Sequence, residues 1–240
     1  GGDLTVNNET AANTVTLGLN AGVAITSASI TNTFIGSSAG KTMTGAGTQH
    51  TAVGYNAMGD ATLGTGHVAI GYNTLKSIAG TNFCTAVGAS AGQNATSGGL
   101  SSTFIGILAG GGVTTGTQNT CIGYLSNPTS ATASYEFTLG HTDINTLRCN
   151  VTSITSLSDA RDKSDIVDTP YGLDFINTLQ PRQFQWATRD GNIKDGRVEQ
   201  GFIAQELLEA AGINKDKLNL VHESNPNKLE ASAGNLVPIL

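Results

Sequence analysis

Charged side chains are scarce in the first 150 residues of this 240-residue chain, where five acidic and three basic residues occur. The net charge of the whole chain is −6 and no run of Lys and Arg is present, which argues against a nucleic-acid partner. No stretch approaches twenty apolar residues, so we expect no insertion into a membrane. Closely spaced carboxylate pairs, which glycoside hydrolases use, are also missing from this part of the chain.

Cysteine is rare as well, with three residues in the chain. Cys84 and Cys121 lie two repeats apart in the pattern described below, which corresponds to about 10 Å between stacked strands. A disulfide needs Cα atoms within about 7 Å, so we expect buried thiols here. The chain opens on Gly1-Gly2, without an initiator Met or a signal peptide, and we expect it to be part of a longer protein.

The composition changes after residue 150. Residues 151–240 carry thirteen acidic and nine basic side chains and have the mixed composition of an ordinary globular domain. We predict an N-terminal β segment with the first repeat over residues 1–31, a Gly-rich β-repeat rod over 32–140, a connector over 141–157 and a small α+β domain over 158–240. The fold class is therefore a mainly β rod followed by a small α+β domain.

A five-residue motif that ends in glycine occurs eight times before residue 141. It covers residues 14–18, 32–36, 50–54, 67–71, 84–88, 102–106, 119–123 and 136–140. The separation of successive closing glycines is therefore almost constant and varies by a single residue. A period this regular indicates one structural unit stacked along an axis, with a short strand, a corner, a second short segment and a turn in each unit.

The residue before each closing glycine is always aliphatic: Leu17, Ile35, Val53, Ile70, Val87, Ile105, Ile122 and Leu139. We predict that this ladder points into a core. The residue before it is small or aromatic, so both faces of the strand are expected to be covered. A single thin coil cannot cover both of its own faces, and we infer that other copies of the chain do so. The rod is then either one β-roll per chain, three side by side, or a triple β-helix or prism. Both alternatives are homotrimeric, by analogy with fibrous viral and adhesin stalks.

Two sets of ring side chains recur in register. His50 and His67 occupy the same place in consecutive repeats, and on a threefold axis their imidazoles could bind a transition metal. A polar ladder on an outer face is the favoured interpretation, and we expect neither a metal nor a cofactor. Tyr55, Tyr72 and Tyr124 also repeat in register, and a packing ladder is favoured over a glycan-stacking surface.

The last third of the chain contains three recognisable blocks. We expect a strand over 143–155, a strand over 182–188 with Phe184 and Trp186 on one face, a turn over 190–192, and a helix over 201–212 that ends at Gly212. The three blocks are Ser158-Asp159-Ala160-Arg161-Asp162-Lys163, Leu179-Gln180-Pro181-Arg182-Gln183-Phe184 and Gly201-Phe202-Ile203-Ala204-Gln205-Glu206. Together they resemble the intramolecular chaperone of the endosialidase type at the end of phage tail spikes and fibres. The repeats are similar to those of phage tail fibres and, more loosely, to the heads of trimeric autotransporter adhesins.

The resemblance implies trimer assembly followed by self-cleavage, with Ser158 as the nucleophile and Lys163 as its base. A lysine accepts a proton only in its neutral form, which burial favours, so cleavage next to Ser158 would wait for assembly. Asp159 and Arg161 match the family and would hold the loop in place. Asp162 departs from the aliphatic residue usual before the lysine, and a carboxylate there favours the charged ammonium. A long helix normally follows in the family, and we expect it to lie beyond this chain.

These observations predict a structural virion protein, the distal part of a tail fibre or spike that attaches to a host surface. Its expected partners are two further copies of the chain, other tail or baseplate proteins, and a glycan or protein receptor. Assembly would take place in the host cytoplasm. Any enzymatic activity would be limited to autoproteolysis by the Ser158 and Lys163 pair, without turnover of an external substrate. The alternatives are a fragment of a polysaccharide-degrading tail spike and a cellular trimeric surface adhesin with the same chaperone.

Overall fold

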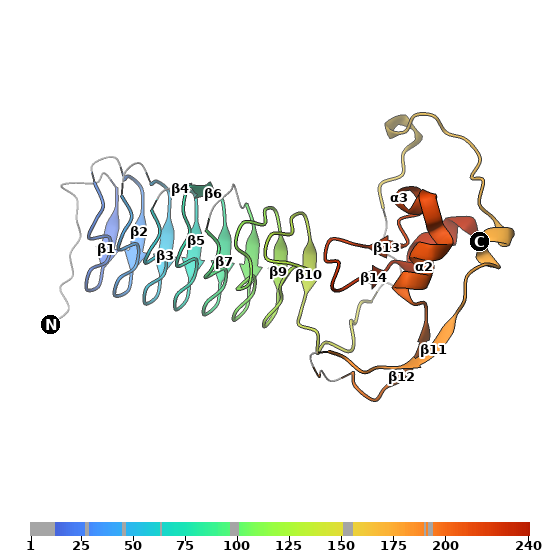
Figure 1. Ribbon diagram of the computed structural model, residues 1–240. Helices are drawn as coiled ribbons and strands as arrows, with labels where there is room; N and C mark the ends of the chain where they lie inside the picture. Colours follow the sequence, from blue (N-terminus) through green and yellow to red (C-terminus); the bar gives the residue numbers. More distant parts are fainter. Residues whose placement is uncertain are drawn as a thin grey trace. The chain divides into compact units, whose positions relative to one another are not determined.

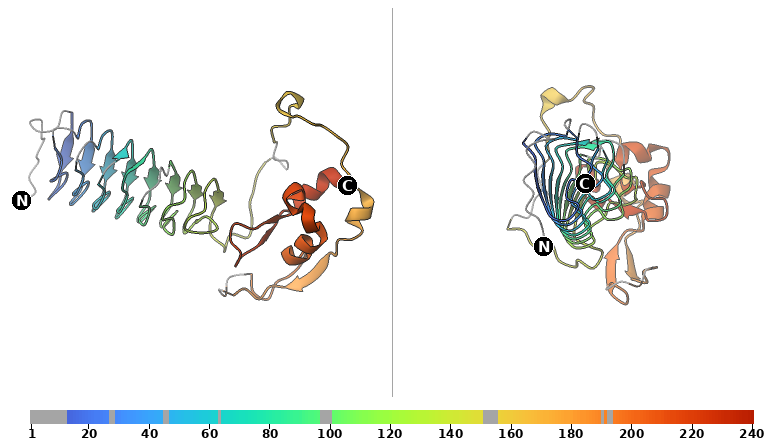
Figure 2. Two further views of the ribbon diagram at one scale, coloured as in Figure 1. Left: turned by 45° about the horizontal axis from the view of Figure 1, so that its top comes forward. Right: turned by 90° about the vertical axis from the view of Figure 1, so that its left-hand side faces the viewer.

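The computed structural model describes residues 13–26, 29–44, 47–62, 64–96, 101–150, 156–189, 191 and 194–240 (Figures 1 and 2). The chain divides into two compact units, Gly1–Thr142 and Asp143–Leu240. The first is a parallel β-solenoid and the second is a small α+β unit, which confirms the predicted secondary structure of both parts. No helix among the described residues is long and apolar enough to cross a membrane. Of the expected N-terminal β segment over 1–31, residues 1–12 and 27–28 lie outside the described residues.

The solenoid contains one parallel sheet of eight three-residue strands that pair in chain order (Figure 1). Each strand ends one residue before a closing glycine, and equivalent positions pair, so that Ala52 lies between Phe34 and Ala69. The strands are β1 Val15–Leu17, β2 Thr33–Ile35, β3 Thr51–Val53, β5 Val68–Ile70, β7 Thr85–Val87, β8 Thr103–Ile105, β9 Thr120–Ile122 and β10 Phe137–Leu139. A smaller parallel pair is formed by β4 Gly64–Thr65 and β6 Thr81–Asn82. The predicted stacking of one repeated unit is therefore confirmed.

The closing glycine is required by both backbone conformation and space. Gly36 has φ +129°, and a Cβ atom there would lie 2.4 Å from the carbonyl oxygen of Gly54. Gly54 has φ +131°, and its Cβ atom would lie 2.5 Å from the carbonyl oxygen of the next closing glycine. Side chains rarely adopt this conformation, and the backbone of the adjacent coil cannot move away without breaking the sheet. The repeat therefore keeps glycine at this position in every coil.

Each coil encloses its own core. The central strand residue points inward, and in some coils its size is matched to that of the residue four positions after the closing glycine. Phe34 is accompanied by Gly40, where a Cβ atom would lie 2.7 Å from the Phe34 ring, and Ala52 is accompanied by Met58. The three side chains of these pairs belong to one continuous buried cluster within the solenoid. In another coil both positions are small, Ala86 and Gly92, and a Cβ atom at Gly92 would meet Phe104 of the next coil.

The prediction that the aliphatic ladder points into the core is wrong. Ile70 and Ile105 are 40% and 41% exposed, while the central residues of the same strands are fully buried. Side chains alternate along a strand, so the residues on either side of the inward central residue point outward. A coil covers the inner face of its own strand and leaves the outer face exposed, in line with the expectation that a single coil cannot cover both faces. Of the two rod architectures, the structure has the β-roll, because one chain forms complete coils by itself.

The second unit surrounds a small core of its own, formed by Leu179, Leu207, Ala211, Leu218, Leu220 and Leu236. It contains a hairpin of β11 Arg182–Gln185 and β12 Val198–Gly201, and a second hairpin of β13 Val221–His222 and β14 Glu230–Ala231. The helices are the 3-10 segments η1 Ala160–Asp162, η2 Gly212–Asn214 and η3 Ala233–Ile239, and the α-helices α1 Leu173–Ile176, α2 Ala204–Ala211 and α3 Lys215–Leu218.

The expected elements of this unit are found with shifted bounds. The strand expected over 182–188 is β11, and Phe184 and Trp186 make an edge-to-face contact with ring centroids 5.4 Å apart. The helix starts at Ala204 rather than at residue 201, because Gly201 ends β12, and Gly212 caps it as predicted. Residues 143–150 contain no strand, in contrast to the prediction, and 151–155 lie outside the described residues. Of the expected turn, only Gly191 is described.

Candidate functional site

Ser158 and Lys163 are brought together by a single turn of 3-10 helix, η1. The carboxylate of Asp159 caps this turn by accepting a hydrogen bond from the backbone N–H of Arg161. Lys163 ends it, and its backbone N–H donates to the carbonyl of Ala160. A cap and one tight turn are the usual means of fixing so short a helix. The five-residue spacing in the sequence thereby becomes a side-chain contact.

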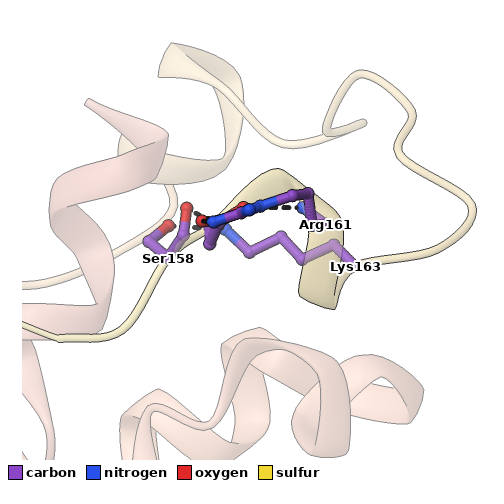
Figure 3. A network of polar contacts seen from close by, with 4 residues as sticks. Ser158, Arg161 and Lys163 are labelled. Carbon is purple, nitrogen blue, oxygen red and sulfur yellow. Dashed lines mark hydrogen bonds and ion pairs between the residues drawn. The ribbon is translucent and has the colours of Figure 1, made fainter.

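The contact joins the two atoms that the resemblance assigns to nucleophile and base. Lys163 Nζ donates to Ser158 Oγ at 2.5 Å and lies 3.3 Å from the carbonyl oxygen of Ser158 (Figure 3). Both residues are exposed to solvent. In this arrangement the ammonium is the donor, whereas activation of the hydroxyl requires the lysine to accept the proton. The two side chains are therefore close enough for proton transfer. Burial of Lys163 would be needed for its nitrogen to accept the proton of Ser158.

Asp159 and Arg161 form an ion pair on the same turn, with Arg161 Nη2 2.7 Å from Asp159 Oδ2. The hydrogen bonds from the Arg161 side chain and backbone hold the pKa of the Asp159 carboxyl below its usual range, and the same pair raises the pKa of Arg161. The pair lies on the turn directly after Ser158. Both groups are exposed, so the pair contributes little to stability.

Asp162 was expected to oppose activation of Lys163 by favouring its charged form. Its side chain is exposed, and within the described part of the chain no ion pair joins it to Lys163. Its carboxylate therefore acts on the ammonium only across solvent, where its field is weak.

The second and third sequence blocks meet in the same unit. Arg182, from the 179–184 block, pairs with Glu206, from the 201–206 block, with Arg182 Nη2 2.7 Å from Glu206 Oε1. The bond lowers the pKa of Glu206 and raises that of Arg182. Residues of both blocks, among them Leu179 and Phe202, line a cavity of about 490 Å³. The blocks are thus one structural feature rather than two independent motifs, which the sequence did not reveal.

His50 and His67 are buried inside the solenoid. Their rings lie inside the coil of their own chain and stack with centroids 5.0 Å apart and an interplanar angle of 10°. His50 Nδ1 accepts the backbone N–H of His67, and His67 Nδ1 accepts that of Cys84. These bonds hold the Nδ1 atom of each ring against the backbone of the next coil. Both rings are buried, 1% and 0% exposed, so neither reaches an outer surface on which imidazoles of several chains could gather.

The histidines belong to a polar ladder, as favoured, but the ladder is buried instead of lying on an outer face. The first residue of the motif accepts a backbone N–H from its counterpart in the next coil. The residues that accept in this way are Thr14, Asn32, His50, His67, Cys84, Ser102 and Asn119, and the series ends at Glu136, whose backbone N–H donates to Asn119. Several also donate to a turn carbonyl, including Asn32 to Gly47 at 3.1 Å and Asn119 to Ala133 at 2.7 Å. Sequence reasoning missed this role, although every member has an acceptor atom.

The tyrosines form only part of the expected packing ladder. Tyr55 and Tyr72 stack with centroids 5.5 Å apart and an interplanar angle of 11°, while Tyr124 meets His141 at a tilted angle. All three tyrosines remain more than half exposed. Their contacts are therefore made along the surface of the solenoid and not within its core.

Comparison with known proteins gives one match. Residues 158–214, somewhat under a quarter of the chain, match the family model of the chaperone of endosialidase. This range contains all three blocks, so the resemblance of the C-terminal domain is confirmed over it. Searches of the curated proteins and of the solved structures gave no significant match.

Proposed function

We propose that the chain is part of a homotrimeric tail fibre or spike, a structural virion protein that attaches to a host surface. The solenoid would form the shaft, and the C-terminal unit would direct assembly of the trimer in the host cytoplasm. Other tail or baseplate proteins and a host glycan or protein receptor are its proposed partners. The observation that carries this proposal is the chaperone-of-endosialidase match in a chain that also contains a parallel β-solenoid.

The outer face of the solenoid sheet supports association between copies. Its sixteen outward residues are the first and last residues of the eight strands, and all are Thr, Val, Ile, Leu or Phe. Ile70, Ile105 and Leu139 are 40%, 41% and 49% exposed. A contiguous apolar face without charge is typical of protein interfaces. Further copies of the chain suit this face, because their side-chain rows repeat with the same spacing of about 4.8 Å.

A structural role is favoured over cleavage of a polysaccharide. In the described part of the solenoid the carboxylates are Asp60 and Glu136, several coils apart. Asp60 pairs with Lys76 at 3.3 Å, and Glu136 accepts hydrogen bonds from the Thr129 backbone and hydroxyl. Glycosidases need two carboxylates within about 10 Å of each other. These two carboxylates serve local structure instead.

Self-cleavage next to Ser158 is the second part of the proposal. Burial of Lys163 when three chains assemble would favour its neutral form, and Nζ could then take the proton of Ser158 Oγ. The hydroxyl oxygen would attack the carbonyl carbon of the adjoining peptide bond, and its C–N bond would break as Nζ passes the proton to the leaving nitrogen. Water would then hydrolyse the resulting ester and release the two fragments. The contact between Ser158 and Lys163 supports this reaction, while their exposure in the single chain agrees with a reaction that waits for assembly.

Denaturing electrophoresis tests the cleavage. The wild-type chain is expected to yield two fragments that separate next to Ser158, the N-terminal one about twice as long as the C-terminal one. Ser158→Ala and Lys163→Met should both give a single full-length band, whereas Lys194→Met, at a lysine outside the site, should be cleaved like the wild type. A full-length wild-type band at every protein concentration would reject cleavage without affecting the structural role.

Light scattering tests the trimer. The uncleaved Ser158→Ala protein should have three times the mass of one 24.5 kDa chain. Ile105→Lys places a charge in the outer sheet face and should reduce the mass to that of one chain while the β signal remains. Lys41→Glu changes a charge at an exposed site away from the strands and should leave the trimer intact. The mass of a single chain for the Ser158→Ala protein would reject the trimer.

A further inference from the structure

The residues that directly follow the closing glycines form a column on the solenoid surface. Tyr55 and Tyr72 occupy it in consecutive coils and are 55% and 54% exposed, although they stack on each other. Tyr124 occupies the same column three coils further on and is 60% exposed. An exposed aromatic pair is costly for a protein unless the rings have a binding partner, because their apolar surface remains in contact with water.

The neighbours of the tyrosine pair in this column are small. The backbone N–H of Asn56 donates to the carbonyl of Ser37, so Ser37 lies beside Tyr55 in the preceding coil. In the same way, the backbone N–H of Ser90 donates to the carbonyl of Tyr72, so Ala89 lies beside Tyr72 in the following coil. Each ring therefore has one face against its partner tyrosine and the other beside a short side chain. One coil spacing of about 4.8 Å on that side suits a second ring lying flat against the tyrosine.

Polar groups without charge accompany the rings. Asn56 and Asn73 directly follow the two tyrosines, and Asn56 Nδ2 donates to Asn73 Oδ1 at 2.8 Å. Residues 55–88, which make up these two coils, contain only Asp60 and Lys76 as charged residues, and these two pair with each other. The surface thus combines apolar ring faces with amide donors and acceptors and has no net charge.

We propose that this column binds a neutral oligosaccharide, with the C–H face of a hexose against Tyr55 or Tyr72 and its hydroxyl groups bonded to the asparagine amides. The chemistry is that of a sugar site, in which an aromatic ring supplies contact area and a few polar groups set orientation. Tyr124 lies about 14 Å from Tyr72, or three coil spacings, and provides a second stacking position for a chain of several sugars. The inference rests on the proposed attachment function and names its ligand class and residues.

Affinity electrophoresis of the full chain tests the site. Native gels would contain dextran, a galactomannan or hydroxyethyl cellulose, which are neutral polysaccharides with different linkages. We expect retarded migration in at least one of these gels. The double variant Tyr55→Ala and Tyr72→Ala should lower the apparent affinity by about five-fold or more, the loss expected for one aromatic stacking contact. The corresponding double Phe variant should retain most of the binding.

Tyr135→Ala provides the matched control, because Tyr135 is 77% exposed but lies in a different column. It should migrate like the wild type in every gel. No retardation in any of the three gels, or equal retardation of the double Ala variant, would overturn the inference. Loss of the trimer mass in the double Ala variant would also overturn it, since the column would then belong to a contact between copies. A protein that binds sugar through these tyrosines but is monomeric would reject only the trimer.

Discussion

Acidification is expected to destabilise the solenoid through one buried side chain, His50. Its ring is 1% exposed, Nδ1 accepts the backbone N–H of His67, and Nε2 lies 3.1 Å from the carbonyl oxygen of Gly64. The first bond requires an unprotonated Nδ1, so the hydrogen must be on Nε2, which donates to Gly64. A second proton, on Nδ1, would point the N–H of the His50 ring at the backbone N–H of His67 inside the coil. Burial, and then the charge of His67, lower the pKa of His50 from 6.5 to about 4.

The size of the effect follows from linkage between protonation and folding. In the unfolded chain an imidazole binds a proton near pH 6.5, whereas the folded coil keeps His50 neutral until about pH 4. Between these values only the unfolded state gains the proton, so the free energy of unfolding decreases as the pH falls. The contribution of neutral His50 to the free energy of unfolding is complete above about pH 6.5. Between about pH 7.5 and pH 4.5, protonation of His50 in the unfolded chain should lower that free energy by about 2.5 kcal/mol.

The test compares variants by urea unfolding of the full chain, followed by the β signal at the two pH values. His50→Asn is the informative change, because Asn32 and Asn119 already make both ladder bonds at equivalent positions. It should reduce the pH dependence of unfolding by about 2.5 kcal/mol relative to the wild type. His222→Asn, the same change at an exposed position, should leave that dependence as it is. An unchanged pH dependence in His50→Asn would refute the reasoning.

Two further predictions concern the coil. Gly54→Ala should cost at least about 3 kcal/mol in unfolding free energy, because it combines a positive φ with a backbone clash, whereas Gly80→Ala, with positive φ and open space, should cost only about 1 kcal/mol. Equal losses would contradict the clash. A thiol reagent should label Cys149 in the native protein, and Cys84 and Cys121 only after unfolding, because burial raises the pKa of both thiols to about 11. Rapid native labelling of all three would contradict the buried positions.

The sequence was sufficient to predict the stacked unit but not the direction in which its side chains point. Regular glycine spacing marks the strand ends, since only glycine fits between adjacent coils. Two adjacent apolar positions precede each glycine, however, and their hydrophobicity alone cannot identify the inward one. Residue size identifies it in some coils, where Phe34 is accompanied by Gly40 and Ala52 by Met58, but not where Ala86 is accompanied by Gly92. The core is continuous from coil to coil, so the space beside a small residue can be filled from a neighbouring coil.

For the candidate site, local spacing was informative and long-range pairing was not. The turn between Ser158 and Lys163 follows from their short separation and a capping Asp159, so its geometry could be predicted. The bond between Arg182 and Glu206 depends on how a hairpin meets a helix, and no local pattern specifies that contact. The buried ladder at His50 was missed for a related reason. A polar residue is expected on an outer face. Its burial can be predicted only if the hydrogen-bond partner of its polar atom in the next coil is known.

The register of the coils restricts how such a shaft can change in length. The strand pairs and the ladder bonds join equivalent positions in adjacent coils, so one residue inserted within a strand would misplace every side chain that follows in that coil. The turns are more tolerant, since the separation of successive closing glycines already varies by one residue. Duplication or loss of one entire coil preserves all of these pairings. The length of the solenoid can therefore change in evolution by one coil at a time, without changes to the sequences of the neighbouring coils.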